Sequence, residues 1–311
     1  MEEGTVSKPV AVLACAAMAV LYVAILYAPT LLLRLPHPSS LKSFMIRRFI
    51  CAAISSLLSF LLSSLILPMR SVEVWELLSA YGVRADHIWQ SVAFPLSLTC
   101  LMYAGSLVLK TLLLIDSCRR YTDSVGGFSF DCANYALRST LDRGISVAYS
   151  VLAWRNYVVA PLTEELVFRA CMIPLLLCGG FKINTIIFLG PVFFSLSHLN
   201  HLMEVYNRQN YNLIKAALAV ALQLGYTLVF GSYASFLFIR TGHLLAPLVA
   251  HICCNYMGLP VLFSRSKGIV SVAFLAGLLG FLWLLFPMTN PDLYNDRTSN
   301  CRCWHGYCSW R

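Results

Sequence analysis

The sequence predicts an all-α fold, a polytopic transmembrane bundle of about eight helices. Three observations predict it. Of the 311 residues, 59% are hydrophobic and only 12% are charged, whereas a soluble domain carries about 25% charged residues. Several windows of about 20 apolar residues can each cross a hydrocarbon core of roughly 30 Å. The polar segments between these windows are mostly short, so the chain is expected to pass through the membrane repeatedly.

The apolar windows set the expected order of the membrane spans. The first window is too long for the core of a signal peptide and has no clear small-residue cleavage site, so it is expected to be a span. The fourth and fifth windows are short and could form one interrupted element. Spans are expected near 9–33, 49–67, 93–115, 145–160, 162–180, 183–199, 213–238, 244–263 and 269–287.

Polar segments between the windows are expected at the membrane surface. Residues 68–92 mix charges with tryptophans and are expected to be interfacial. Residues 116–144 carry both charge signs, which predicts either a surface loop or an amphipathic interfacial helix. The basic residues of the loop at 34–48 favour a cytosolic position for that loop. After Pro287 the chain turns polar and is expected to leave the bilayer.

The net charge of +9 does not indicate nucleic-acid binding. The basic residues are scattered over short loops and form no stripe with interleaved aromatic residues, a pattern typical of contacts with anionic lipid headgroups. No repeat or second domain is visible. We therefore predict one transmembrane domain at 1–288, with its core at 154–260, and a polar C-terminal tail at 289–311.

Most of the twelve cysteines lie in apolar segments, where a free cysteine behaves as a small hydrophobic residue. The tail differs, because Cys301, Cys303, His305 and Cys308 lie close together and could hold zinc. Their spacing matches no known zinc site, so a disordered or membrane-adherent tail is the favoured interpretation.

The first of three polar clusters in the second half holds two adjacent glutamates, Glu164 and Glu165. An ionised carboxylate at the bilayer centre costs roughly 2.5–3.5 kcal/mol on insertion scales, so such residues are usually functional. Pro161 suits the first turn of a helix. Successive helix positions are about 100° apart, so the two glutamates point to different faces. Glu165 can pair with Arg169 one turn later, which leaves Glu164 available for chemistry.

The second and third clusters supply two histidines and an amide. His198 lies near the end of an expected span, and His251 and Asn255 share one face of another. A lone histidine near a helix end is usually a satisfied polar residue, and His201 is interpreted in this way. The side chains of Glu164, His198, His251 and Asn255, however, each need a partner in a medium without water. They satisfy one another most economically around one wet, membrane-embedded cavity, which is a functional-site hypothesis.

These groups favour hydrolysis of an amide without a covalent intermediate. A glutamate and a histidine can jointly hold and deprotonate a water. A histidine and an asparagine opposite them can donate hydrogen bonds to the developing oxyanion. The expected catalytic pair is Glu164 with His198, and the expected stabilising pair is His251 with Asn255.

Nucleophilic alternatives rank lower. Ser195 and Ser197 are close to His198 in sequence, but neighbours at i+1 and i+3 on one helix rarely give nucleophile–base geometry, and no G-x-S-x-G turn is present. Cys253 and Cys254 lie beside a histidine and allow a thiol mechanism. Both alternatives stay open.

A zinc site and two non-hydrolytic functions are the remaining alternatives. Zinc held by Glu164, His198 and His251 is chemically possible, but the H-E-x-x-H spacing is absent, so no cofactor is expected and zinc is a minority alternative. Buried glutamate and histidine also make proton relays, as in a proton-coupled transporter. The absence of an inverted repeat argues against a transporter. A non-catalytic membrane scaffold is a weaker alternative.

Taken together, the three clusters resemble the type II CAAX prenyl endopeptidases, or Ras-converting enzymes, of the ABI/CPBP family of membrane proteins. The resemblance rests on an E-E-x-x-x-R motif, an F-x-x-x-H motif and an H-x-x-x-N motif in this order, within roughly 154–260. The motif residues are Glu164, Glu165, Arg169, Phe194, His198, His251 and Asn255. The flanking Pro161-Leu162-Thr163 and Tyr256-Met257-Gly258 also agree.

The resemblance implies an eight-helix bundle in the endoplasmic reticulum membrane, with a conical cavity open to the cytosol. It implies a metal-independent glutamate protease that removes the last three residues of farnesylated or geranylgeranylated CAAX proteins, such as small GTPases. Carried over by position, Glu164 and His198 activate the water. His251 and Asn255 form the oxyanion hole. Glu165 and Arg169 support and orient the site. Membrane lipids are the other expected partners, and no nucleic acid is expected.

Overall fold

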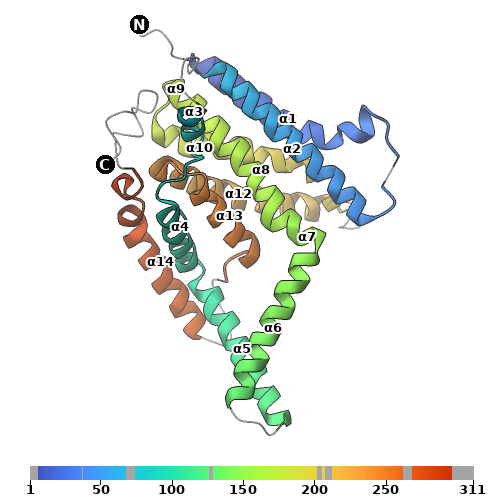
Figure 1. The fold of residues 1–311 in the computed structure, drawn as a ribbon, viewed down its shortest axis with the longest axis vertical. Helices are drawn as coiled ribbons and strands as arrows, with labels where there is room; N and C mark the ends of the chain where they lie inside the picture. The colour runs from blue at the N-terminus through green and yellow to red at the C-terminus, as the bar shows by residue number, and fades with distance from the viewer. Residues whose placement is uncertain are drawn as a thin grey trace.

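The computed structural model describes residues 6–36, 38–67, 74–125, 129–201, 205–206, 212–261 and 268–295. In these ranges the chain forms helices and no β-strand, so the predicted all-α class is confirmed. Figure 1 shows the helices gathered into one bundle, from which a single hairpin projects.

The N-terminal half of the chain contributes six helices to the described ranges. They are α1 (Lys8–Leu31), α2 (Leu41–Ile66), α3 (Val74–Ala80), α4 (Ile88–Met102), α5 (Ala104–Val125) and α6 (Ser129–Tyr149). The expected basic loop at 34–48 is shorter than predicted, because α2 begins at Leu41. The Ser40 side chain caps α2 by accepting a hydrogen bond from the Ser43 backbone N–H, which satisfies one of the orphan donors of a helix start.

The C-terminal half starts with a composite helical run, Val151 to Cys178, and continues with separate helices. The run comprises α7 (Val151–Trp154), the π-helical η1 (Arg155–Val159), α8 (Ala160–Glu165), the π-helical η2 (Leu166–Cys171) and α9 (Met172–Cys178). Then follow α10 (Ile183–Ser197), the 3-10 helix η3 (His198–His201), α12 (Leu213–Thr241), α13 (Leu245–Met257), α14 (Gly268–Met288) and the 3-10 helix η4 (Pro291–Leu293).

Length and composition identify the helices that can cross a membrane. Within the described ranges, four single helices are long and apolar enough, namely α1, α2, α12 and α14. The bent pair of α4 and α5 is a fifth candidate if the pair is counted as one span. The apolar α10 and α13 are shorter. Together with the composite run, these elements are the candidates for the eight expected helices. The chain is therefore a multi-pass membrane protein.

The expected span near 93–115 is bent, because α4 and α5 meet at an angle of 78°. The bend lies at Tyr103, whose buried hydroxyl donates a hydrogen bond to Gly258 O at 2.7 Å. Helix α14 packs closely against the bend through Gly277, where a Cβ would lie 2.5 Å from Ala104 Cβ. Contacts from α13 and α14 therefore stabilise this bend.

The two short windows form one interrupted element, as predicted, with two π segments, but it starts at Val151, because residues 145–149 belong to α6. Pro161 and Pro174 lie in this run, and each lacks the N–H that a regular helix needs. A missing donor favours a local shift of the hydrogen-bond ladder, and π segments are frequent at functional sites. The six-residue α8 between the two π segments carries both glutamates.

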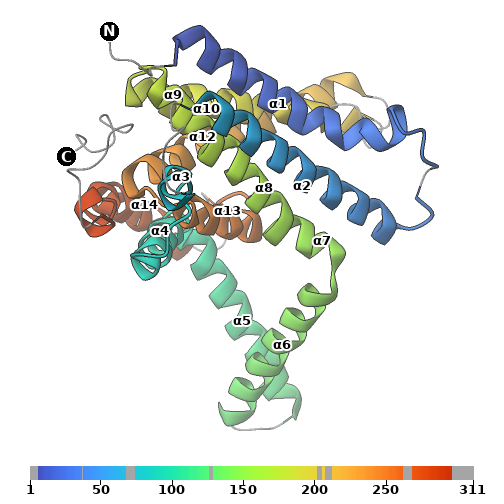
Figure 2. The same cartoon turned by 45° about the horizontal axis from the view of Figure 1, so that its top comes forward.

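The described parts of the polar stretch, 116–125 and 129–144, are helical, so the helical alternative holds there. They form the end of α5 and most of α6, which make a hairpin that projects away from the bundle in Figures 1 and 2. Part of the expected interfacial segment 68–92 is helical, in α3 and the start of α4. The cysteine–histidine cluster of the tail lies outside the described residues.

The hydrophobic core holds the composite run in place. Phe168, Met172 and Ile173 are at most 1% exposed and pack among buried residues of α1, α10 and α12. Polar contacts also cross this core. Ser63 Oγ donates to Cys171 O at 3.1 Å, and the Tyr22 and Thr163 hydroxyls lie 3.1 Å apart. The first contact holds η2 and the second holds α8.

Candidate active site

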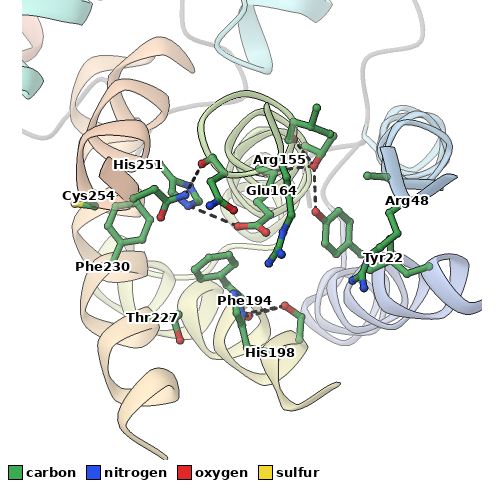
Figure 3. A pocket seen from close by; sticks show the side chains of 18 of the residues that line it. Tyr22, Arg48, Arg155, Glu164, Phe194, His198, Thr227, Phe230, His251 and Cys254 are labelled. Atoms are coloured by element: carbon green, nitrogen blue, oxygen red, sulfur yellow. Dashed lines mark hydrogen bonds and ion pairs between the residues drawn. The ribbon is translucent and has the colours of Figure 1, made fainter. Parts of the chain in front are cut away.

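A cavity of about 390 Å³ opens beside α8 and is lined from α1, α2, the composite run, α10, α12 and α13. Figure 3 shows its lining side chains. Glu164, His198, His251 and Asn255 all contribute to the lining. The structure thus brings together the four polar residues that the sequence predicted to converge.

The two glutamates point in different directions, as their helical spacing predicted. The Glu164 side chain is 16% exposed and faces the cavity, whereas the Glu165 side chain is 0% exposed. The 100° step between neighbouring helix positions produces this separation. One carboxylate is therefore accessible from the cavity, and the other is available to position its neighbours.

Glu165 lies at the centre of a buried ionic contact. Its Oε1 is 3.1 Å from Arg169 Nη1, one helical turn away, and 2.7 Å from His251 Nδ1. The Arg169 contact has the distance of an ion pair without hydrogen-bond geometry, so attraction between the charges is its main contribution. The Arg169 guanidinium also lies over the Phe194 ring at 4.5 Å and near the Phe230 ring at 5.7 Å. The predicted Glu165–Arg169 pair is present.

His251 bridges the two glutamates. Its Nδ1 contacts Glu165, and its Nε2 lies 3.7 Å from Glu164 Oε2 (Figure 3). An ionised carboxylate only accepts hydrogen bonds, so the short contact with Glu165 places a proton on Nδ1. The contact between Glu165 and His251 was not predicted from the sequence, because helical spacing indicates which residues share a face but not which helices face one another.

Phe194 explains the first position of the F-x-x-x-H motif. His198 Nδ1 lies 2.9 Å from Phe194 O, and the two rings meet edge to face with centroids 4.8 Å apart. A carbonyl oxygen only accepts, so this hydrogen bond requires the proton on Nδ1 and leaves Nε2 as the basic nitrogen of the neutral ring. Since Phe194 also lies under Arg169, one aromatic residue positions members of two motifs.

Asn255 is held by the first π segment. Its Nδ2 donates to Asn156 O at 2.8 Å. An amide nitrogen carries two hydrogens, so one remains to be donated to a substrate. The exposed side chain of Asn255 lies one turn after His251 on α13, and both residues line the cavity.

The alternative nucleophiles are less favourably placed. Ser195 Oγ donates to Leu224 O at 2.9 Å and is not among the cavity-lining groups. Ser197 lines the cavity, but its hydroxyl donates to Phe194 O at 2.7 Å. Cys254 lines the cavity, whereas its neighbour Cys253 does not. In the part of the chain that the structure describes, no three side chains of the His, Cys, Asp or Glu type form a group that could hold a metal ion.

Two cationic side chains of the cavity were not singled out from the sequence. Arg48 lies on α2 and Arg155 on η1, and Figure 3 places both on the cavity wall. Arg48 was interpreted only as part of a basic loop. Neither arginine could be assigned to the cavity from the sequence, because their proximity to Glu164 depends on how α2 and the π segment pack.

Comparisons with known proteins agree with this arrangement. The profile of the family described as "Type II CAAX prenyl endopeptidase Rce1-like" matches residues 146–257. The chain is 57% identical over 307 residues to "CAAX prenyl protease 2" of Arabidopsis thaliana, covering 98% of both chains. It is 35% identical to "CAAX prenyl protease 2" of Homo sapiens, covering 92% of this chain and 83% of that protein. No solved structure gives a significant match.

Proposed function

Because the chain belongs to the type II CAAX prenyl endopeptidase family, we propose that it removes the C-terminal tripeptide from prenylated CAAX proteins in the cavity beside α8. The observation that carries the proposal is the convergence of Glu164, His198, His251 and Asn255 on that cavity. The human and Arabidopsis relatives are named as CAAX prenyl proteases, which supports the same substrate class for this chain.

In the proposed reaction Glu164 and His198 hold a water molecule and remove its proton. The resulting hydroxide attacks the carbonyl carbon of the third peptide bond from the C-terminus. The carbon–nitrogen bond then breaks, and the proton passes to the leaving amine nitrogen, so that one water is consumed. Two groups fit general base catalysis here: the accessible carboxylate of Glu164 and His198 Nε2.

His251 and Asn255 are proposed to stabilise the tetrahedral oxyanion. Asn255 donates through the second hydrogen of Nδ2. His251 carries one proton on Nδ1, so donation from Nε2 requires the imidazolium form. Glu165 accepts the hydrogen bond from Nδ1 and so orients the ring with Nε2 toward Glu164. Arg169 compensates the negative charge of Glu165 and completes the support of the site.

The bilayer supplies the rest of the proposed substrate recognition. A farnesyl or geranylgeranyl chain contributes about 0.8 kcal/mol of membrane affinity for each buried CH₂ group. It therefore brings the adjacent peptide bond to membrane depth. Prenylated small GTPases are the proposed protein substrates, and the endoplasmic reticulum membrane is the proposed location.

The direct test of this function is release of a tripeptide. Purified full-length protein in lipid nanodiscs is incubated with a CAAX peptide that is farnesylated at its cysteine, and products are identified by mass spectrometry. We expect a single cut after the prenylated cysteine and at least about tenfold slower cleavage of the unprenylated peptide, because the lipid chain contributes binding energy. No cleavage of either peptide would contradict the proposal, and pH-coupled flux in proteoliposomes would then favour the transporter alternative.

Metal independence is tested in the same assay. A Glu–His activated water needs no metal, so prolonged incubation with a strong chelator, followed by its removal, is expected to leave the rate within about twofold of its starting value. Metal analysis of the active protein provides the control. Stoichiometric zinc whose removal abolishes activity would contradict the metal-free mechanism and favour zinc as the activator of the water.

A further inference from the structure

The cavity contains more positive charge than the hydrolytic step uses. Its charged lining residues are Glu164, Arg48 and Arg155, so the arginines outnumber the carboxylate when both histidines are neutral. Figure 3 shows the Arg155 side chain reaching toward the space between Glu164 and His198, and Arg48 beside Tyr22 on the opposite wall. These two guanidinium groups are the basis of the inference.

Neither cation is satisfied by a carboxylate among the residues that the structure describes. Arg155 is exposed to the cavity and makes no hydrogen bond or ion pair in these ranges. Arg48 is half-buried, and its guanidinium lies 5.6 Å from the Phe44 ring centroid. Its neighbour Arg47 differs, because its Nη1 donates to Pro36 O at 3.1 Å and it does not line the cavity. Two arginines thus present their donors to the cavity.

A guanidinium group is well suited to one kind of ligand. Its planar fork of N–H donors matches the two oxygens of a carboxylate, and such charge-assisted bidentate contacts are stronger than contacts between neutral groups. Every CAAX substrate carries one carboxylate at a fixed place, the α-carboxylate of its last residue. This carboxylate lies three residues beyond the peptide bond that the proposed function cuts.

Distances along the chain fit this ligand. An extended tripeptide spans about 10 Å. Arg155 precedes Glu164 by nine residues on one helical run, which separates their backbones by about 13 Å along the helix axis. The tripeptide and the length of an arginine side chain can together bridge this separation. In Figure 3 the Arg155 side chain extends toward Glu164. To hold a carboxylate one tripeptide away from the cut it turns away from Glu164 along the cavity wall, and the separation of the two backbones leaves room for this.

We propose that Arg155, assisted by Arg48, binds the C-terminal α-carboxylate of the substrate and so determines that three residues are removed. This inference rests on the proposed function and names the part of the cavity that recognises the free end of the peptide. The two arginines are specificity residues, whereas the cut is made by the groups around Glu164.

The test compares two farnesylated peptides that differ only at the C-terminus, one with a free acid and one with an α-carboxamide. For the unchanged protein in nanodiscs, kcat/KM for the acid is expected to exceed that for the amide by about tenfold or more. Arg155→Gln should lower kcat/KM for the acid by about tenfold, mainly through a higher KM, and should leave kcat/KM for the amide within about twofold of its starting value. Arg48→Gln should also lower kcat/KM for the acid. Arg47→Gln is the matched control and should change kcat/KM for neither peptide.

Two results would overturn the inference. The unchanged protein could cut the acid and the amide equally well, or Arg155→Gln could slow both peptides by the same factor. The second result would indicate that Arg155 acts on folding or on Glu164 rather than on the carboxylate.

A binding measurement separates this inference from the proposed function. Fluorescent versions of both peptides are titrated into Glu164→Ala protein, which cannot turn them over in the proposed mechanism. Tighter binding of the acid that is lost in the Glu164→Ala/Arg155→Gln double variant supports carboxylate recognition, even if no cleavage were ever observed. Equal binding of acid and amide would contradict it, even if cleavage were observed.

Discussion

At the scale of single residues, the site depends on one buried carboxylate that positions an arginine and a histidine. Glu165 contacts both Arg169 and His251 through the same oxygen, and all three side chains are at most 6% exposed. A buried charge that loses its partner is strongly destabilising, typically by about 3–5 kcal/mol, whereas loss of both charges together is often tolerated. This asymmetry leads to a double-variant test.

Glu165→Gln is expected to lower the thermal stability of the purified protein, because it leaves the Arg169 guanidinium buried without a counter-charge. Arg169→Met combined with Glu165→Gln should be more stable than Glu165→Gln alone. Activity should not return in the double variant, because His251 has still lost the carboxylate at Nδ1. Melting temperatures and tripeptide release are measured on the same samples.

Additive losses of stability in the double variant would contradict this account. They would mean that Glu165 and Arg169 contribute independently. Recovery of full activity in the double variant would contradict the positioning of His251 by Glu165.

Much of the candidate site could be predicted from the sequence, but not all its contacts. Helical spacing indicated that Glu164 and Glu165 face different ways and that Glu165 pairs with Arg169, and the structure has both features. The contact between Glu165 and His251 and the presence of Arg155 in the cavity depend on which helices become neighbours. One sequence contains no direct information about those neighbours, so these features could only be seen in three dimensions.

At the scale of elements, glycine determines how closely α14 approaches the bend between α4 and α5. Gly277 and Gly280 lie one turn apart on α14 and differ in their surroundings. A Cβ at Gly277 would lie 2.5 Å from Ala104 Cβ and closer still to Leu101 O, whereas a Cβ at Gly280 would be 3.6 Å from Leu101 Cδ2. Only the first position requires the absence of a side chain.

Gly277→Ala is therefore expected to destabilise the protein by about 1–3 kcal/mol, as overpacking does in a close-packed interior. Gly280→Ala is the matched control and should be neutral or slightly stabilising, because alanine favours the helix over glycine. Thermal unfolding in one detergent compares the two variants. An equal effect of both substitutions would show that close packing at Gly277 does not hold the bend.

The apolar windows predicted where most helices lie, but not where the helices bend or end. Most apolar windows correspond to helices, because a long apolar run in lipid has few alternatives to a helix. The window at 93–115 did not predict the bend at Tyr103. Helix α14 packs against this bend through Gly277, which is far away in the sequence. The window at 244–263 ended too late, since α13 stops at Met257 before Gly258, whose φ of 72° suits glycine.

At the scale of the whole molecule, a polar cluster at one end of the bundle connects three distant segments. Arg84 forms an ion pair with Asp86 and donates to Tyr294 O at 3.1 Å, beside the last described residue. His243, between α12 and α13, is 0% exposed, and its Nε2 lies 4.0 Å from Asp86 Oδ1. Burial, with a further contribution from the Arg84 charge, lowers the pKa of His243 to about 4.

This lowered pKa predicts loss of stability in acid. The unfolded chain binds a proton at His243 near its ordinary pKa of about 6.5, whereas the folded protein does not until about pH 4. Stability is therefore fully present above pH 6.5 and decreases as the pH falls toward 4. The melting temperature should fall from pH 7 to pH 5, and less steeply in His243→Leu. An unchanged slope in that variant would assign the acid sensitivity to other groups.

The central claim is that Glu164 and His198 activate water in the cavity. The most direct test is the single-turnover rate of tripeptide release from a farnesylated peptide by Glu164→Gln and His198→Ala proteins, with exposed Asp116→Asn as the control. Removal of a general base slows a reaction by about 10²–10⁴-fold. We predict such a loss in both site variants, with unchanged melting temperatures and a normal rate for the control. Release at the normal rate by the folded Glu164→Gln or His198→Ala protein would contradict the claim.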